Sequence, residues 1–222
     1  MVAAGSEDMS GNDGRPRIGR PSYDEVEVAE RKQRILDAAI TLVPQLGSSN
    51  VRLKDIAAQA GVSVGTLQHY FASRHELIES AFAVHARRVV DGIEAAIEHT
   101  DDPWQQVCAL IARFSAVKDV QSRSALWVEF AAESARNAHL RKLMGDTYAE
   151  WRAILSGAVI NGSRSGAFVF DITAEQAVDG ICALLDGYEV ANAIGVWRES
   201  DGRSDVVLLN LIARILGYSG AE

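Results

Sequence analysis

Residues 53–71 read LKDIAAQAGVSVGTLQHYF, and this stretch decides the fold. Apolar side chains recur at helical spacing on both sides of Gly61, which predicts two short helices, about Leu53–Ala60 and Val64–Tyr70, joined by a tight turn. Ser63 stands where its hydroxyl can cap the first turn of the second helix. Two short helices joined by a glycine-containing turn form a helix-turn-helix, whose second helix enters the major groove of DNA.

The second helix carries side chains suited to reading DNA. Gln68 can pair with adenine, Thr66 can touch a thymine methyl group, and His69 can donate to a base or a phosphate. For Lys54 and Arg74, which are expected at phosphates, the alternative is a solvated surface charge, and Tyr70 can instead pack inward. The expected DNA-binding residues are Arg52, Lys54, Ser63, Val64, Gly65, Thr66, Gln68, His69, Tyr70 and Arg74.

The distribution of charge also favours DNA binding at one end of the chain. The net charge is −8, yet residues 15–88 hold 11 Lys and Arg against 8 Asp and Glu, while residues 89–222 hold 11 against 19. A mildly basic head can meet phosphates on its own, because charges further away than a Debye length of about 8–10 Å are largely screened.

The rest of the chain predicts an all-α fold of about nine helices, because nearly every segment has helical periodicity and no run alternates like a strand. Residues 1–22, rich in Gly, Ser, Asp and Pro, predict a disordered arm. We expect a three-helix DNA-binding domain over 23–72 and a larger ligand-binding and dimerisation domain over 73–222. The latter opens with a connecting helix, 73–99, that a capping box of Ser73 and Glu76 begins.

The order and spacing of the motif resemble the DNA-binding signature of TetR-family transcriptional regulators over about residues 30–80. The resemblance is carried by D-I-A at 55–57, A-G-V-S at 60–63, G-T-L at 65–67 and H-Y-F at 69–71. It implies a homodimer on double-stranded operator DNA, released when a small molecule binds the C-terminal body. Arg52 departs from the usual capping threonine, and Gln68 from a frequent aromatic residue, which leaves the operator sequence open.

The C-terminal half is similar to the betaine and choline regulators of that family at residues 126–133 (LWVEFAAE) and 184–187 (LLDG). Aromatic stripes and acids here suggest a ligand pocket, although the same stripes can simply form the core. The ligand is expected to be either a cation, drawn to the acids, or a neutral aromatic or apolar molecule. The expected pocket residues are Trp127, Phe130, Glu133, Tyr148, Trp151 and Asp186.

Dimerisation is expected through the last two helices, predicted over about Thr173–Gly195 and Asp205–Leu216, whose apolar surfaces are wide enough to pair with a second copy. Leu209 and Ile212 are the residues expected at that contact. A further helix is predicted to run from about His139 to Asn161 and to end at Gly162.

Catalysis and cofactors are not expected. The five histidines show no metal-ligand pair backed by acids, and no phosphate loop or nucleophile elbow is present. The alternative to operator binding is a helical interaction protein, or an enzyme, that retains a helix-turn-helix. Without a signal-like N-terminus or an apolar run of about 20 residues, the chain is expected in the cytoplasm and not in a membrane.

Overall fold

The computed structural model describes residues 23–115, 120–196 and 203–220, and the statements below concern these residues. The predicted arm, residues 1–22, lies outside them. All regular structure in the described part is helical, which confirms the all-α prediction. The helices are α1 (Tyr23–Leu46), α2 (Leu53–Ala60), α3 (Val64–Tyr70), α4 (Arg74–Ile97), α5 (Pro103–Ser115), α6 (Val120–Ser134), α7 (Ala138–Ser165), α8 (Ala174–Ala193) and α9 (Arg203–Ile215).

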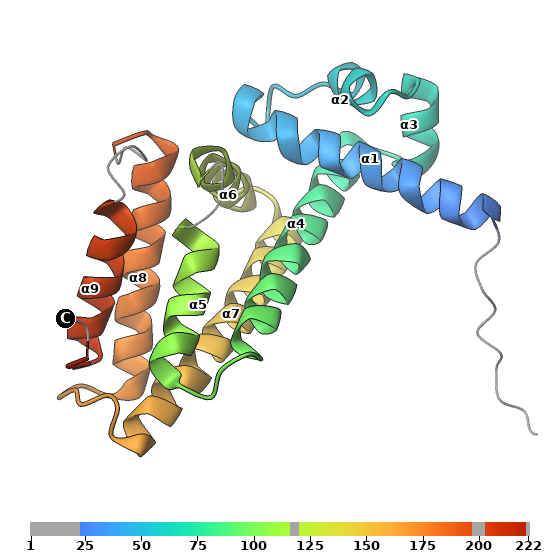
Figure 1. The fold of residues 1–222 in the computed structure, drawn as a ribbon. Coiled ribbons are helices and arrows are strands. Elements are labelled where there is room, and N and C mark those ends of the chain that lie inside the picture. Colours follow the sequence, from blue (N-terminus) through green and yellow to red (C-terminus); the bar gives the residue numbers. More distant parts are fainter. Residues whose placement is uncertain (1–22, 116–119, 197–202, 221–222) are drawn as a thin grey trace, which may run out of the picture.

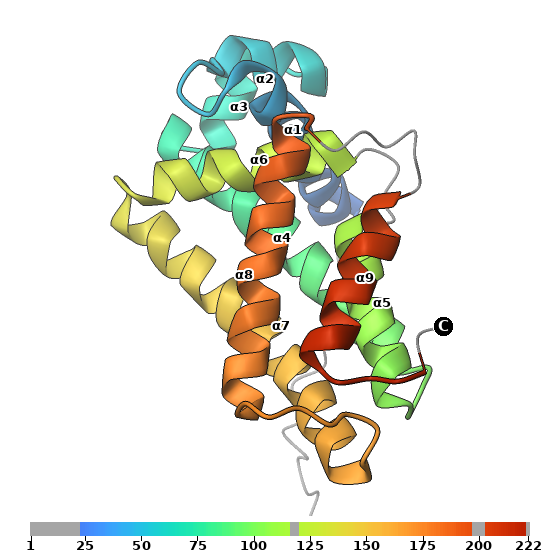
Figure 2. The same cartoon turned by 90° about the vertical axis from the view of Figure 1, so that its left-hand side faces the viewer.

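The helices form a small head and a larger body (Figure 1). The head consists of α1, α2 and α3, and α4 runs from it into the body, as the sequence predicted for a connecting helix. In the body, α6 packs against α8 and α7 and also against α1 of the head. Seen from the side, α8 and α9 lie next to each other on the outside of the body (Figure 2). No described helix is both long and apolar enough to cross a bilayer.

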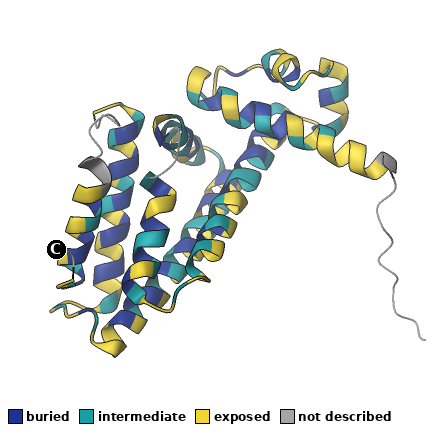
Figure 3. Ribbon diagram, in the orientation of Figure 1, coloured by how far each residue is buried: buried dark blue, intermediate teal, exposed yellow. Residues whose placement is uncertain are grey.

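The head has a close-packed core that continues into the body. Ile56 of α2 and Leu67 of α3 are fully buried, and they belong to one cluster with Phe82 of α4, Phe130 of α6 and Leu140 of α7. The buried stripes of these helices face one another, as their colouring shows (Figure 3). Because a packed core is not continuously deformable, a movement of α4 or α6 changes the packing of the helix-turn-helix.

Two helix starts follow the predicted caps, with one difference. At α8, the side chains of Thr173 and Gln176 each accept the other's backbone amide, which is the reciprocal capping box expected from the sequence. At α4, Ser73 Oγ accepts the amide of Glu76 at 3.1 Å, but Glu76 reaches back to the amide of Ala72, at 2.8 Å, and not to that of Ser73. The carboxylate therefore ties the end of the α3 segment to α4.

The predicted end of α7 at Gly162 is wrong. The helix continues to Ser165 and ends at Gly166, whose φ of +79° lies in the left-handed region. Gly162 serves another purpose: a Cβ atom at this position would lie 2.1 Å from Cδ2 of Phe168, whose ring is 2% exposed in the body core. The absence of a side chain lets the α7–α8 connection fold back onto α7.

Two glycines of α7 should therefore respond in opposite ways to alanine. Gly162→Ala should destabilise the protein by about 1–3 kcal/mol, because Phe168 cannot move without disturbing the core. Gly157→Ala is the matched control: a Cβ atom there meets nothing within 4 Å, and alanine should stabilise the helix by about 0.5–1 kcal/mol. Urea unfolding of both variants measures the difference, and equal effects would contradict the packing described here.

Candidate functional site

The turn between α2 and α3 is built around Gly61. Its φ of +67° and ψ of 36° lie in the left-handed region, which glycine enters without strain. The amide of Gly61 donates to the carbonyl of Ala58 at 3.2 Å, and that of Val62 donates to Ala57 at 3.0 Å. The last carbonyls of α2 are thus satisfied inside the turn, which fixes the direction in which α3 leaves.

Ser63 begins α3 as its N-cap, in agreement with the sequence. Its Oγ accepts the amide of Thr66 at 3.0 Å and lies 2.8 Å from Thr66 Oγ1. On the inner side, Leu67 and Phe71 are buried and anchor the helix. The outer side of α3 is left free to meet another molecule, with Val64, Gly65, Gln68 and His69 exposed.

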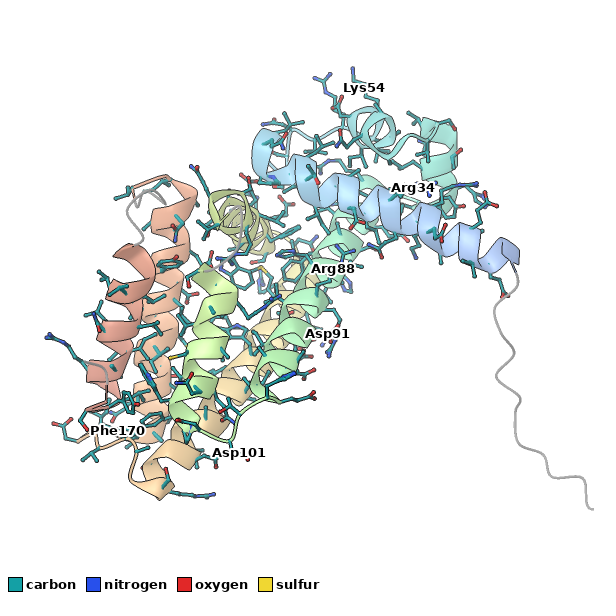
Figure 4. All side chains as sticks on the ribbon, in the orientation of Figure 1. Arg34, Lys54, Arg88, Asp91, Asp101 and Phe170 are labelled. Atoms are coloured by element: carbon teal, nitrogen blue, oxygen red, sulfur yellow. The ribbon has the colours of Figure 1, made fainter. Side chains whose placement is uncertain are left out.

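The other predicted DNA-binding residues differ in exposure. Arg52 and Lys54 are exposed, and Figure 4 shows Lys54 projecting outward from α2. Arg52 occupies the N-cap position of α2 without a side-chain cap, while its amide donates to Asp55 at 3.3 Å. The Arg52 guanidinium is therefore not used by the cap. Thr66 and Tyr70 are half-buried, and the Tyr70 ring packs edge-on against that of His69.

Arg74 is turned inward. Its Nε donates to the carbonyl of Val51 at 2.9 Å, and one of its terminal nitrogens, Nη2, is buried. This bond ties the first turn of α4 to the segment before α2, so the geometry favours a positioning role over a phosphate contact. One positively charged residue near α3 was not predicted from the sequence. It is Lys32 of α1, whose Nζ lies 5.5 Å from the centre of the Phe71 ring, beside the end of α3.

A cavity lies inside the body, enclosed by five helices. The centre of a water molecule can reach about 30 Å³ of it, so the walls lie close together and must move apart to admit a larger molecule. Its walls are mostly apolar and aromatic, and the polar groups that face it come from α4, α6, α7 and α8. Its charged and large aromatic lining residues include Phe114, Arg123, Trp127, Trp151, Asp186 and Glu189.

A buried ion pair stands in the wall of this cavity. Arg123 of α6 and Glu189 of α8 bring a terminal nitrogen and a carboxylate oxygen to 2.7 Å, with side-chain exposures of 14% and 4%. Arg123 also donates to the carbonyl of Phe114 at 2.6 Å. The sequence missed both residues; the available signal was the position of Glu189, which follows Asp186 by three residues within the mostly apolar run 181–193.

Asp186 is paired with a neutral side chain. It accepts a hydrogen bond from the hydroxyl of Tyr148 at 3.0 Å. Burial raises the pKa of the Asp186 carboxyl, and the Tyr148 hydrogen bond offsets part of this effect. Burial, followed by the nearby charge of Asp186, raises the pKa of Tyr148.

His85 of α4 is the second basic side chain that lines the cavity. Burial lowers its pKa to about 4, and the positive charges of Arg123 and Arg88 act in the same direction. The imidazole is therefore neutral near pH 7, so Arg123 is the ionised cation among the residues that line the cavity. In the described part of the chain, no group of three or more His, Cys, Asp and Glu side chains is placed to hold a metal ion.

The structure brings some of the predicted pocket residues together and separates others. Trp127, Trp151 and Asp186 line the cavity, and Tyr148 contacts both Asp186 and the edge of Trp151. Phe130 does not line it: this ring is fully buried against Phe82 in the head-side core. Sequence periodicity placed Trp127 and Phe130 on one stripe, and only the tertiary packing separates them.

Glu133 faces the head and not the cavity. With Glu129, one turn earlier on α6, it approaches the segment that joins α1 to α2: Glu129 accepts the amide of Ser48 at 2.7 Å, and Glu133 lies 3.5 Å from the Ser48 hydroxyl. Ser48 is itself buried. A charge-assisted bond of this length is among the stronger hydrogen bonds in proteins, so α6 holds the helix-turn-helix directly.

The outer face of α8 and α9 is apolar and exposed. Val190 is 50% exposed, Val207 is 43% exposed and Leu211 is 40% exposed. The prediction that Ile212 lies on this face is wrong, because Ile212 is fully buried in the body core, and Leu209 is only partly exposed. Leu211, the residue before Ile212, lies on the outside instead.

A helix-turn-helix joined to a helical body with an enclosed cavity defines the class of one-component transcriptional regulators. Residues 35–81 match the family described as bacterial regulatory proteins, tetR family, and residues 105–217, more than half of the chain, match the C-terminal domain of BetI-type transcriptional repressors. The chain belongs to the TetR family, and its C-terminal domain is of the BetI type.

Individual relatives agree with this assignment. The HTH-type transcriptional regulator BetI of Brucella canis is 29% identical over 195 residues, which cover 86% of this chain and 95% of that protein. BetI of Brucella anthropi is 30% identical over 166 residues, covering 74% and 82%. The chain is thus a ligand-responsive transcriptional repressor of a family whose members bind operator DNA and act as dimers.

Solved structures share the fold. A transcriptional regulator of Saccharomonospora viridis, in complex with choline, superposes with a TM-score of 0.74 at 23% identity, covering 86% of this chain and 97% of that one. FadR of Bacillus subtilis, in complex with stearoyl-CoA, superposes with a TM-score of 0.68 at 19% identity, covering 83% and 97%. One fold therefore occurs in complexes with ligands of very different chemistry.

The exposed residues of the head give a prediction for DNA binding. Gln68→Ala should lower affinity for the operator by about 1–3 kcal/mol and relax selectivity at one base position, because a base-edge contact is lost. Lys54→Ala should instead weaken binding to operator and random DNA alike and reduce the salt dependence by about one ion.

Fluorescence anisotropy with operator and scrambled duplexes, repeated at several salt concentrations, separates these effects. Gln59→Ala on α2 is the matched control for Gln68, since both are exposed glutamines of the head. If Gln68→Ala weakened both duplexes equally, its assignment to base reading would have to be given up.

Proposed function

We propose that this repressor senses a compact organic cation of the quaternary-ammonium kind. The observation that carries the proposal is the excess of carboxylate in an aromatic cavity. Asp186 and Glu189 both line it, one turn apart on α8, whereas Arg123 is the one ionised cation among the lining residues. With both acids ionised, the empty cavity lacks one positive charge, and a buried charge without a partner is costly.

The aromatic walls support the same ligand class. The rings of Phe114, Trp127 and Trp151 face the cavity from three different helices. An aromatic face attracts an ammonium group by about 0.5–2 kcal/mol per contact, more when water is excluded. The choline bound to the Saccharomonospora viridis regulator is a ligand of this chemistry. Stearoyl-CoA, bound to FadR, is a phosphate-bearing anion that these two carboxylates would repel.

We further propose that a homodimer, paired through the exposed face of α8 and α9, presents two copies of α3 to a palindromic operator. The head, residues 23–72, supplies the DNA contacts, and the half-site centres lie about 34 Å apart or a small multiple of it. The ligand releases the operator by binding the DNA-free state more tightly, since only unequal affinity for two states shifts their populations.

Calorimetry with choline tests the ligand class. Its neutral carbon analogue, 3,3-dimethylbutan-1-ol, has nearly the same shape without the charge and serves as the matched ligand. We expect choline to bind at least about tenfold more tightly, which corresponds to about 1.4 kcal/mol. Asp186→Asn should remove most of this difference, while Asp171→Asn, which makes the same charge change at an exposed site, should leave it.

The pH dependence gives an independent check on Asp186. Because burial raises the pKa of this carboxyl, lowering the pH protonates it and removes a negative charge from the cavity. Choline affinity should therefore fall as the pH falls through that pKa, and the slope should be smaller in Asp186→Asn. Tighter binding of neutral aromatic compounds than of choline would support the rival ligand class and overturn the proposal.

Leu211→Arg tests the dimer. A buried arginine without a partner is strongly unfavourable at an apolar contact, so the variant should be monomeric by light scattering and should lose operator affinity. Ala149→Arg, on the exposed surface of α7, is the control and should remain dimeric. A dimeric Leu211→Arg protein with full operator affinity would show that the chains pair through another surface.

A further inference from the structure

Glu189 is the most deeply buried carboxylate of the described chain that faces the cavity, at 3% exposed. Neither of its oxygens has a hydrogen-bond partner among the described residues, although Arg123 approaches to 2.7 Å. The two groups therefore neutralise each other's charge without the geometry of a hydrogen bond. A buried pair of this kind gains little stability, because its attraction barely exceeds the cost of removing both charges from water.

Arg123 sits where a ligand cation would sit. Its guanidinium lies beside the Glu189 carboxylate, inside the cavity wall, with its central carbon 5.7 Å from the centre of the Phe114 ring. A carboxylate together with an aromatic face is the same combination that attracts an ammonium group. In the ligand-free protein, this cation site is thus filled by a side chain of the protein itself.

Arg123 also faces a second space, on the side of the head. A groove between α1 and α6 is lined by Ile40, Thr41 and Pro44 of α1, and its wall includes Arg123 and His85, which the groove shares with the cavity. The Nε atom of Arg123 has no hydrogen-bond partner among the described residues. Its Nη2 atom donates to the carbonyl of Phe114 at 2.6 Å and to the hydroxyl of Ser124 at 3.3 Å, and both bonds have to break when the guanidinium moves. The groove between α1 and α6 can therefore accept the guanidinium if it leaves Glu189.

We propose that Arg123 is a built-in competitor for the ligand: it neutralises Glu189 in the empty cavity, and a cationic ligand binds by displacing its guanidinium into the groove between α1 and α6. The link to a physiological ligand rests on the proposed function. The displacement itself does not, because any small cation that fits beside Glu189 can report on it.

This competition makes the response selective for charge. A neutral molecule leaves the pair of Arg123 and Glu189 intact, whereas a cation can take the place of Arg123 without leaving Glu189 unpaired. It also gives the ligand an effect on the head, because the displaced guanidinium enters the space next to Thr41 and Pro44 of α1. Arg123 thus acts as a specificity-determining residue without having to touch the bound ligand.

Chemical rescue of Arg123→Ala tests the proposal. This variant leaves Glu189 without its cation and opens the space that the guanidinium filled. Methylguanidinium at millimolar concentration should raise the Tm of Arg123→Ala in a dose-dependent manner and leave that of the wild type unchanged. Urea, the neutral counterpart of guanidinium, should give no rise. The double variant Arg123→Ala/Glu189→Gln, which has no buried charge to neutralise, should not respond to either compound.

A second measurement uses choline. With the competitor removed, Arg123→Ala should bind choline roughly tenfold or more tightly than the wild type does, as expected when no buried partner has to be displaced. Arg123→Lys, which keeps the charge in a compact and more strongly hydrated group, should fall between them. If Arg123→Ala does not fold unaided, two other measurements test the proposal. One is whether methylguanidinium restores folding of this variant, and the other is the choline affinity of Arg123→Lys.

The outcomes separate this inference from the proposed function. Rescue by methylguanidinium without choline binding to any variant would support the competitor and reject the quaternary-ammonium ligand. If the wild type binds choline, unchanged or weaker binding by both Arg123 variants would overturn the competitor, and so would the absence of rescue by methylguanidinium.

Discussion

A carboxylate buried in an apolar wall needs a cation or a hydrogen-bond donor beside it, and this constraint organises the body of the repressor. Glu189 of α8 is held inside the protein only because Arg123 of α6 reaches it. The pair joins two helices that are distant in sequence, and the aromatic rings that exclude water from it also make the walls of the cavity. Because the pair itself contributes little stability, it can be broken by a ligand that carries the same charge.

Helix α6 links the exchange of Arg123 for a ligand cation to the DNA-binding head. The cavity end of this helix carries Arg123 and Trp127, while Glu129, within two turns of both, accepts the amide of Ser48 in the head. Phe130, the residue after Glu129, belongs to the same packed core as the helix-turn-helix. A shift of α6 therefore has to change either the Ser48 bond or the core. To reverse a 99:1 population of DNA-binding and released states, the ligand must discriminate between them by about 5.5 kcal/mol across the dimer.

The sequence predicted what is local and missed what depends on distant partners. Gly61, Ser63 and Leu67 act within one turn of themselves, so their spacing was enough to define the helix-turn-helix. Arg123 and Glu189 lie 66 positions apart, and nothing in periodicity pairs them. The same limit explains why the predicted roles of Phe130, Glu133 and Ile212 were wrong. The sequence placed these residues on helices correctly. Tertiary packing decides whether a given face of a helix meets the cavity, the head or a second chain.

The Ser48 amide is the most direct test of the account, because it reports on the link between cavity and head at a single atom. In the ligand-free protein this amide donates to Glu129 at 2.7 Å, and a short charge-assisted bond gives a strongly downfield proton resonance that exchanges slowly with solvent. Amide NMR during a choline titration is the measurement. We expect the Ser48 resonance to move upfield and to exchange faster as choline fills the cavity. A Ser48 resonance that stays unchanged while choline binds and operator DNA is released would contradict it.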